Sequence, residues 1–513
     1  MAHPASFALG SNSRSHQSTV ARSGNLHDCP TSAGVSKTEG AVDCAPLTRS
    51  THACSPPRAA GMDEGADMTQ QPKTKINVWL TDPASWATNE TDIAVSAASE
   101  FNEAHPEYQV EINRHDFRTM PAEVARAAEH GETPDIAEYH FTATRAAMDM
   151  LGPDGNPLFT PVGRAIAGRS EILGERVVLD DMVPAARDYF RYQGELMAIP
   201  RTASGIVLYA NMDLLAKAGI TEPPRTWLEV TAACEALAKL PGPMHGIAWP
   251  NFYWVFLQSV AQQGGLITDR DNGRSGRAEK VNLASAEMMN YVRWWQGLHR
   301  DGHYLYTGEL LDFAGGYAAF EEQRIGLFLS SSVDASHLLD RGERHGFTVA
   351  VSPMPYNDDV PLAGNMMGGF ALWLAAGLSQ VKQDGALAFI QYLNRPSNAA
   401  EWAKRHHRIP ISRAAVDVLH EEGWYRDNPR LRVAGEQLEA ADGSPAALGP
   451  LLGGQAGIMG EITSAMHDVL TNGAEPHARF AEATRRAQQI LDAYNSYCDG
   501  PPRRTPNDLA VSL

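Results

Sequence analysis

The chain has 513 residues, of which 43% are hydrophobic and 20% are charged, so it is long enough for more than one domain and can bury substantial cores. It carries 43 Lys and Arg against 61 Asp and Glu, a formal net charge of −18. This balance disfavours a nucleic-acid or anionic-membrane binder, since both partners attract a basic face. No stretch approaches the roughly 20 apolar residues of a membrane-spanning helix, so we expect no integral membrane protein.

Both ends of the chain have the composition of disordered segments. Residues 1–72 are rich in Ser, Ala, Gly, Pro and Thr, and Phe7 is their only aromatic residue. Such a segment cannot bury enough apolar surface to offset its ordering entropy, which predicts disorder over 1–72 and again over 496–513. The first segment also lacks the apolar core of about 7–15 residues that a secretory signal contains, so no signal peptide is visible.

Strands and helices alternate after this segment. The predicted strands cover 76–80, 110–112 and 134–139, and the predicted helices cover 93–104 and 123–130. Alternation of this kind favours a parallel sheet covered by helices. Ligands of such sheets bind beyond the carboxyl ends of the strands, so Asp82, Trp86 and Tyr139 are candidate ligand contacts by position.

Strands and helices also alternate in the rest of the chain. Further strands are predicted at 206–209, 325–329 and 370–374, and helices at 212–218, 386–393, 459–471 and 478–494. Thr226 and Glu229 have the spacing of a capping box at the start of another helix. Ser331 and Ser332 directly follow the predicted strand 325–329, at an edge where ligands commonly bind.

Motifs of catalysis, phosphate binding and metal binding are absent. The sequence has no Walker loop, G-x-G-x-x-G, G-x-S-x-G or H-E-x-x-H. Residues 269–273 are weakly similar to a calcium loop, but the spacing of glycine and glutamate favours a turn. His406 and His407 are adjacent and would point about 100° apart on a helix, and none of the five cysteines forms a C-x-x-C pair. We therefore expect no cofactor, no metal and no catalytic residues, although an acid/base pair among the 61 carboxylates stays an open alternative.

Several segments resemble one family in the order in which they occur. They are 192–200 (YQGELMAIP), 208–211 (LYAN), 224–227 (PRTW), 368–373 (GGFALW), 395–402 (RPSNAAEW), 409–415 (IPISRAA), 423–425 (GWY) and 427–429 (DNP). Together they resemble the extracellular solute-binding proteins of ABC importers, in the maltose-binding superfamily. The run from 395 to 429 is most similar to the subfamily that binds glycerol-3-phosphate and glycerophosphodiesters. The resemblance covers roughly residues 76–495.

The resemblance implies an α/β, two-lobe periplasmic-binding-protein-like (type II) fold with a hinge and a ligand cleft between the lobes. One lobe would contain 76–198 plus 370–407 and the other 201–364 plus 411–495, with crossings near Pro200, Gly368 and Arg408. The implied function is delivery of a carbohydrate, polyol or glycerophosphodiester to ABC permease subunits by closure of the cleft. The protein would be an extracytoplasmic monomer. A ligand-sensing receptor on the same fold is the alternative, because fold alone does not separate the two.

The resemblance also implies ligand contacts. Ser204 follows the first crossing, Trp254 lies where the subfamily stacks tryptophan on ligand, and Gly369 matches a glycine whose backbone approaches ligand. Each has a structural alternative: serine can satisfy a turn, tryptophan is commonly a core residue, and glycine can simply allow a bend. Ser331 and Ser332 join this set by their position after the strand.

The sequence differs from the subfamily at the positions that bind phosphate. Residues 448–454 read LGPLLGG and lack the subfamily's arginine, an acidic cleft residue is replaced near His140, and Arg408 stands where a cleft tyrosine is usual. Arg408 could supply the missing positive charge through bidentate bonds to an anionic ligand. Its structural alternative is an ion pair with a nearby carboxylate such as Glu401.

Overall fold

A computed structural model describes residues 72–82, 90–242 and 244–500. The predicted disordered segment 1–72 lies outside the described residues apart from its last residue, and Trp86 also lies outside them. The predicted C-terminal tail starts too early: helix α20 (Pro476–Asp499) continues past Tyr494 before the description ends.

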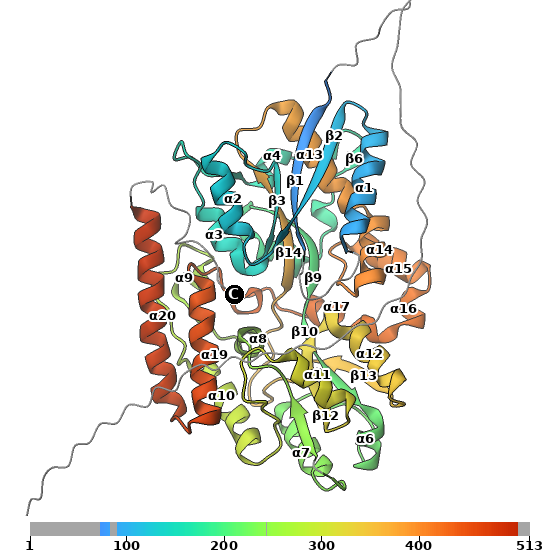
Figure 1. Ribbon diagram of the computed structural model, residues 1–513, viewed down its shortest axis with the longest axis vertical. Helices are drawn as coiled ribbons and strands as arrows, with labels where there is room; N and C mark the ends of the chain where they lie inside the picture. Colours follow the sequence, from blue (N-terminus) through green and yellow to red (C-terminus); the bar gives the residue numbers. More distant parts are fainter. Residues whose placement is uncertain (1–71, 83–89, 243, 501–513) are drawn as a thin grey trace, which may run out of the picture. The chain divides into compact units, whose positions relative to one another are not determined.

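The first of two main sheets has the order β2-β1-β3-β14-β4, with β9 pairing β14. Its strands are β1 (Thr74–Asp82), β2 (Tyr108–Asp116), β3 (Ile136–His140), β4 (Phe159–Thr160), β9 (Ile199–Ser204) and β14 (Gly368–Ala375). β1 is parallel to β2 and to β3, as the alternation of strands and helices predicts. β14 runs antiparallel to β3 and enters from a distant part of the chain, so the complete sheet is mixed (Figure 1).

Helices pack on this sheet with their apolar positions inward. They include α1 (Glu90–Ala104), α2 (Met120–Glu129), α3 (Thr144–Asp149) and α13 (Gln380–Leu393). The alternating residues Ile76, Val78 and Leu80 of β1 are fully buried, which fits a strand covered by helices. Gly385 of α13 lets the helix approach Tyr108 closely, since a Cβ at this position would overlap the tyrosine ring.

The second sheet has the order β11-β12-β10-β13. Its strands are β10 (Ile206–Asn211), β11 (His245–Ala248), β12 (Ile325–Ser331) and β13 (Val349–Pro353). β10 is antiparallel to β12 and β13, whereas β11 is parallel to β12. Helix α7 (Trp227–Leu237) covers β11, and the predicted capping box between Thr226 and Glu229 is confirmed.

The other elements connect or flank these sheets. The helices are α4 (Val162–Ile166), α5 (Pro184–Tyr189), α6 (Met212–Lys217), α8 (Tyr253–Gln262), α9 (Asp269–Gly273), α10 (Ala286–Arg300), α11 (Phe313–Glu321), α12 (Ala335–Arg344), α14 (Pro396–His406), α15 (Arg413–Glu421), α16 (Trp424–Asp427), α17 (Val433–Glu439), α18 (Pro445–Leu448) and α19 (Gln455–Thr471). Two short hairpins complete the set: β5 (Glu171–Ile172) with β6 (Glu175–Arg176), and β7 (Arg191–Tyr192) with β8 (Glu195–Leu196). Within the described part of the chain, no helix is long and apolar enough to cross a membrane.

Three segments that pass between the sheets lie side by side. Gly368 and Gly369 at the start of β14 pair with Ser204 and Ala203 at the end of β9. The backbone of Ala203 also exchanges hydrogen bonds of 2.9 and 3.3 Å with Ile409. The predicted crossings are therefore neighbours in space, although the residue limits of the two lobes stay a prediction.

Candidate functional site

The crossing segments bring three predicted positions together. Gly368 lies under the ring of Trp254 and beside Ser204: a Cβ here would come 2.7 Å from Cη2 of the tryptophan and 3.2 Å from the serine Oγ. Gly369 has a φ of +134°, and a Cβ there would overlap the carbonyl oxygen of Thr202. Only glycine fits this backbone, so the predicted bend accounts for Gly369, and an approach of its backbone to a ligand stays a prediction.

Ser331 and Ser332 lie against the first crossing. The Oγ of Ser332 accepts a hydrogen bond from the backbone N–H of Gly205 at 3.3 Å, and the backbone N–H of Ser332 donates to the Gly205 carbonyl at 2.8 Å. The Oγ of Ser331 accepts from the N–H of Val333 at 3.4 Å. A hydroxyl that accepts from the backbone still has a proton to donate, so these contacts leave the serines able to bind a solute oxygen.

Arg408 faces an aromatic group at the carboxyl ends of β2 and β3. Its guanidinium lies 5.9 Å from the ring centroid of Phe370, and that ring lies 5.1 Å from His140 and 6.2 Å from Phe117. The carboxylate of Glu401, the alternative partner of Arg408, is engaged by Arg405 at 2.6 Å. A role for Arg408 in binding a solute stays a prediction.

The charge of Arg408 acts on two titratable groups, the partly buried His140 and the buried Asp334. Burial, with a further contribution from Arg408, lowers the pKa of His140 to about 3, so this imidazole is neutral at physiological pH. Burial raises the pKa of Asp334 to about 7, although hydrogen bonds from Ser330 and Tyr317 and the charge of Arg408 oppose the rise. The Oγ of Ser330 donates to Asp334 at 2.5 Å. The site therefore combines one permanent cation with a carboxyl group that titrates near neutrality.

Tyr139 does not join this group. In β3 it points to the face opposite His140, because successive side chains of a strand alternate. Its ring lies 5.7 Å from Phe159 and 6.3 Å from Trp373, and it is buried. Tyr139 is thus a core residue of the first sheet. Asp82 does end β1 as predicted, but its side chain and the whole of Trp86 lie outside the described residues.

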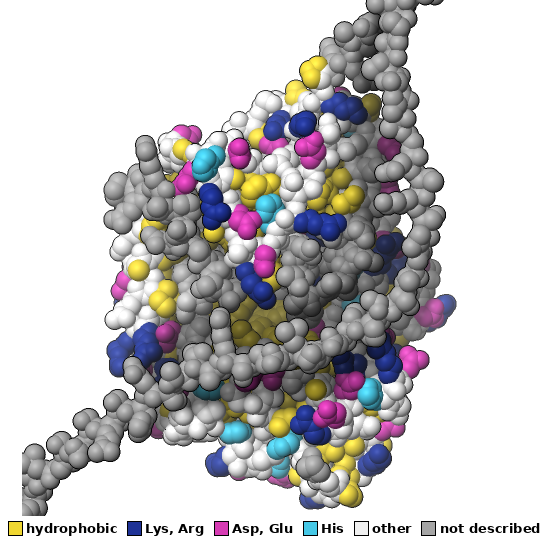
Figure 2. Space-filling model, viewed as in Figure 1, with side chains coloured by type: hydrophobic (Ala, Val, Ile, Leu, Met, Phe, Trp, Pro, Cys, Tyr) yellow, Lys and Arg dark blue, Asp and Glu magenta, His cyan; other side chains and the backbone are white. Residues whose placement is uncertain are grey.

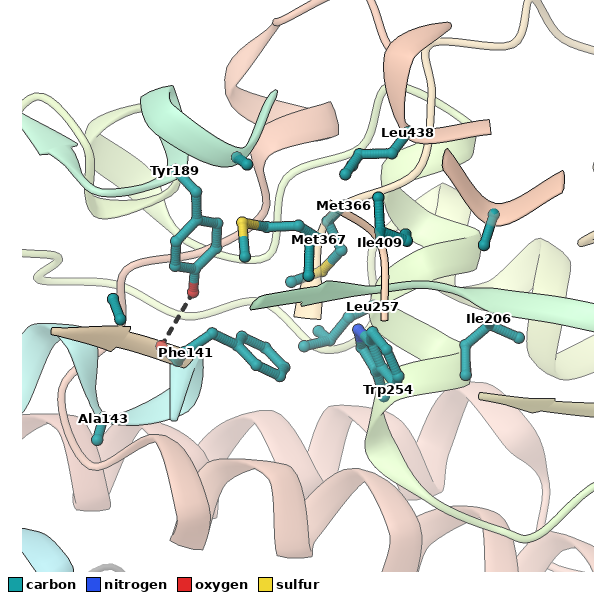
Figure 3. Packing of buried hydrophobic residues seen from close by; sticks show 14 of the residues in the cluster. Phe141, Ala143, Tyr189, Ile206, Trp254, Leu257, Met366, Met367, Ile409 and Leu438 are labelled. Carbon is teal, nitrogen blue, oxygen red and sulfur yellow. Dashed lines mark hydrogen bonds between the residues drawn. The ribbon is translucent and has the colours of Figure 1, made fainter. Parts of the chain in front are cut away.

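Phe141 adds an aromatic contact that the sequence analysis did not select. Its ring lies 5.8 Å from that of Trp254, and its carbonyl accepts a hydrogen bond from the Tyr189 hydroxyl at 3.1 Å (Figure 3). The buried indole N–H of Trp254 has no hydrogen-bond partner within the described residues. Five other buried tryptophans share this feature, so the unpaired N–H does not by itself mark a binding position. Phe141 lies two residues after the predicted strand 134–139, and that position was its only sequence signal.

The residues of the crossing region are largely buried. Ser204, Trp254, Ser331 and Ser332 are each less than a tenth exposed, and the Phe141–Trp254 contact joins the end of β3 to α8. Hydrophobic side chains form the floor of a hollow on the face drawn in Figure 2.

A separate cavity of about 570 Å³ lies between α5 and the α15 and α18 segments. None of the predicted contact residues lines it. The charged residues that line it are Arg413 and four carboxylates, Asp188, Asp417, Glu439 and Asp442. Their summed charge is negative, which disfavours an anionic solute there.

Comparisons with known proteins agree on one family. Residues 96–432 match the family described as bacterial extracellular solute-binding protein. The sn-glycerol-3-phosphate-binding periplasmic protein UgpB of Escherichia coli (strain K12) is 25% identical over 407 residues, covering 77% of this chain and 88% of its own.

Solved structures share the fold at lower identity. The cyclic alpha-maltosyl-1,6-maltose binding protein from Arthrobacter globiformis superimposes with a TM-score of 0.67 at 18% identity, covering 82% of this chain and all of its own. UgpB from Mycobacterium tuberculosis, solved in complex with glycerophosphocholine, superimposes with a TM-score of 0.63 at 18% identity, covering 83% of this chain and 99% of its own. At these identities the likeness shows the two-lobe fold.

Proposed function

Since the chain belongs to the bacterial extracellular solute-binding protein family, we propose that it captures a small solute in the cleft between its lobes and presents it to an ABC importer. The main support for this proposal is one observation. Ser204 and Trp254 lie against Gly368, at the place where segments of the chain pass between the two sheets. A solute bound there would contact both lobes at once and stabilise their closure. Binding and release then need no covalent step.

The proposed solute is a sugar, a polyol or a glycerophosphodiester. Trp254 offers an apolar ring face with an unpaired indole N–H at its edge, which suits a hydroxylated ring or chain. Ser331 and Ser332 offer hydroxyl groups, and Arg408 offers a charge that could pair with a phosphodiester. Two relatives support this class of solute. One is named for binding sn-glycerol-3-phosphate, and the other was solved in complex with glycerophosphocholine.

The proposed setting follows from the same family. We expect the protein to work outside the cytoplasm as a monomer that docks on ABC permease subunits in its closed form. The residue limits of the lobes, 76–198 plus 370–407 and 201–364 plus 411–495, form part of this proposal. The pairing of Gly368 with Ser204 and of Ala203 with Ile409 supports crossings at these positions.

Binding can be tested with a small panel of maltose, sn-glycerol-3-phosphate and glycerophosphocholine. A solute that binds the native state alone raises its stability by mass action, so thermal unfolding identifies it and calorimetry then gives the stoichiometry. We expect one molecule bound per chain and the same compound recovered unchanged after incubation. Conversion of the bound compound to a product would contradict the proposal and support an enzyme.

The Arg408→Ala variant should bind glycerophosphocholine about 2 kcal/mol more weakly than the wild type, roughly a 30-fold loss, because a charge-assisted contact to the phosphodiester is removed. Calorimetry with maltose should show a much smaller change, because maltose has no charge. The matched control is Arg405→Ala, since Arg405 is a neighbouring exposed arginine whose 2.6 Å ion pair is with Glu401. Equal losses in the two variants, or unchanged glycerophosphocholine affinity in Arg408→Ala, would show that Arg408 does not bind the solute.

A further inference from the structure

The buried carboxylate of Asp149 is held by Arg145 of the same helix and by two side chains from distant parts of the chain, those of Arg277 and Tyr494. Its Oδ2 accepts from the Nε of Arg145 at 2.7 Å and from the hydroxyl of Tyr494 at 2.9 Å, and its Oδ1 accepts from the Nη2 of Arg277 at 3.1 Å. The side chain of Asp149 is 5% exposed. Such a fully paired buried carboxylate fixes the relative position of the elements that carry its partners.

These elements belong with different sheets. Asp149 ends α3, which packs on β3 of the first sheet. Tyr494 lies in α20, which packs on α10 and α19, and both of these helices contact α8, the helix of Trp254 (Figure 1). Arg277 precedes α10 and also pairs with Asp499 of α20 at 2.6 Å. The contacts of Asp149 with Arg277 and Tyr494 therefore cross between the lobes.

A second contact crosses at the same place. Arg274 donates through Nη2 to the carbonyl of Leu448 at 2.7 Å and through Nε to that of Gly449 at 2.8 Å, which anchors it on its own side. Its Nη1 donates to the carbonyl of Tyr189 at 3.0 Å, and its guanidinium stacks 5.0 Å from the Tyr189 ring centroid. Tyr189 ends α5, which packs on β9 of the first sheet.

The charges in these contacts are stable at neutral pH. Burial alone would raise the pKa of Asp149, but the hydrogen bonds and charges of Arg145 and Arg277 outweigh it and hold this pKa below its usual range. Burial lowers the pKa of Arg274 to about 10, which still leaves the guanidinium protonated. Opening of the lobes would hydrate the Asp149 carboxylate and its arginine partners, which is favourable. It would also break the hydrogen bonds between them, which is unfavourable.

We propose that Arg277 and Tyr494 on Asp149, together with Arg274 on Tyr189, form an interlobe latch that stabilises the closed arrangement by contacts made outside the solute site. This rests on the proposed function, in which lobe closure accompanies binding. Because these contacts join the lobes outside the crossing segments, opening of the lobes would break them, so they belong to the closed state. A latch raises the closed fraction of the free protein, and the apparent affinity for any solute rises with that fraction.

Single-molecule fluorescence transfer on the solute-free, full-length protein tests the latch. Dyes attached through p-acetylphenylalanine at Val381 of α13 and Leu228 of α7, which are 57% and 69% exposed, report the separation of the lobes without using the native cysteines. We expect Arg277→Gln and Tyr494→Phe each to lower the ratio of closed to open molecules about ten- to hundredfold, as for loss of one buried hydrogen bond to a charged group.

The control is Arg395→Gln. Arg395 makes a bidentate contact with Glu175 at 2.6 and 2.7 Å, and both residues lie beside α13 in the part of the chain that carries the first sheet. This variant should leave the ratio unchanged. The latch is refuted if the two latch variants keep the wild-type ratio, if Arg395→Gln lowers it equally, or if the wild type has no closed population. Because no solute is present, these outcomes are separate from any failure of the solute panel.

Discussion

Replacing Arg201 with methionine should lower the free energy of unfolding by about 3–5 kcal/mol, because the change leaves a buried carboxylate without its cation. The Nε of Arg201 donates to Glu138, and the side chains of the pair are 4% and 0% exposed. The second oxygen of Glu138 accepts from the backbone N–H and the hydroxyl of Thr81 at 2.9 and 2.6 Å. Urea unfolding of the variant and the wild type at pH 7 measures the loss.

Two further variants separate the buried charge from other causes. Lys75→Met breaks an ion pair of 2.9 Å with Glu111 whose side chains are 65% and 44% exposed, and should cost less than about 1 kcal/mol. Adding Glu138→Gln to Arg201→Met should recover part of the loss, because the unpaired charge is then gone. A cost for Arg201→Met as small as that of Lys75→Met would contradict the assignment of a buried ion pair.

This ion pair matters for the site because it joins strands that end there. Thr81, Glu138 and Arg201 lie in β1, β3 and β9, and His140 follows two residues after Glu138 on the same face of β3. The guanidinium of Arg201 also stacks 4.3 Å from the ring centroid of Trp402. The network therefore fixes the strand ends from which His140 and the first crossing extend.

Asp334→Asn should remove a pH dependence of stability worth about 4 kcal/mol. Burial raises the pKa of Asp334 from an ordinary 3.8 to about 7, so the folded state holds this proton more tightly than the unfolded state does. The contribution is fully present below about pH 4 and is lost as the pH rises to 7, and a shift of about three pKa units corresponds to about 4 kcal/mol. Asparagine cannot titrate, so the wild type should lose stability relative to the variant over this range.

The comparison must be made against the variant because His140 acts in the opposite direction. Burial lowers the pKa of His140 from 6.5 to about 3, so its contribution is lost as the pH falls through this window. Both proteins contain His140, and its effect cancels in their difference. Urea unfolding at pH 4, 5.5, 7 and 8 should show that difference falling steadily from pH 4 to 7; a difference that stays flat would mean that Asp334 ionises normally.

Some features of this protein were predictable because they depend on neighbours in sequence. The alternation of apolar residues over 76–80 predicted β1, and the spacing of Thr226 and Glu229 predicted a capping box that the structure confirms. The order of segments predicted the family, which the match over 96–432 shows. Each of these signals lies within a few residues of chain, or in a run of such segments, so no tertiary contact was needed to recognise it.

Other features were decided only by the tertiary structure. Tyr139 and His140 both end a strand that is buried on both faces, so alternation could not tell the residue that faces the core from the one that faces Arg408. The sequence did not single out Asp334. Its importance follows from the structure, in which its carboxyl group is buried and accepts a hydrogen bond from Ser330. The latch joins Asp149 to Tyr494, which are 345 residues apart. Sequence patterns report which side chains suit burial, whereas the partner across a lobe is fixed by how the sheets and helices pack, and that information is distributed over the whole chain.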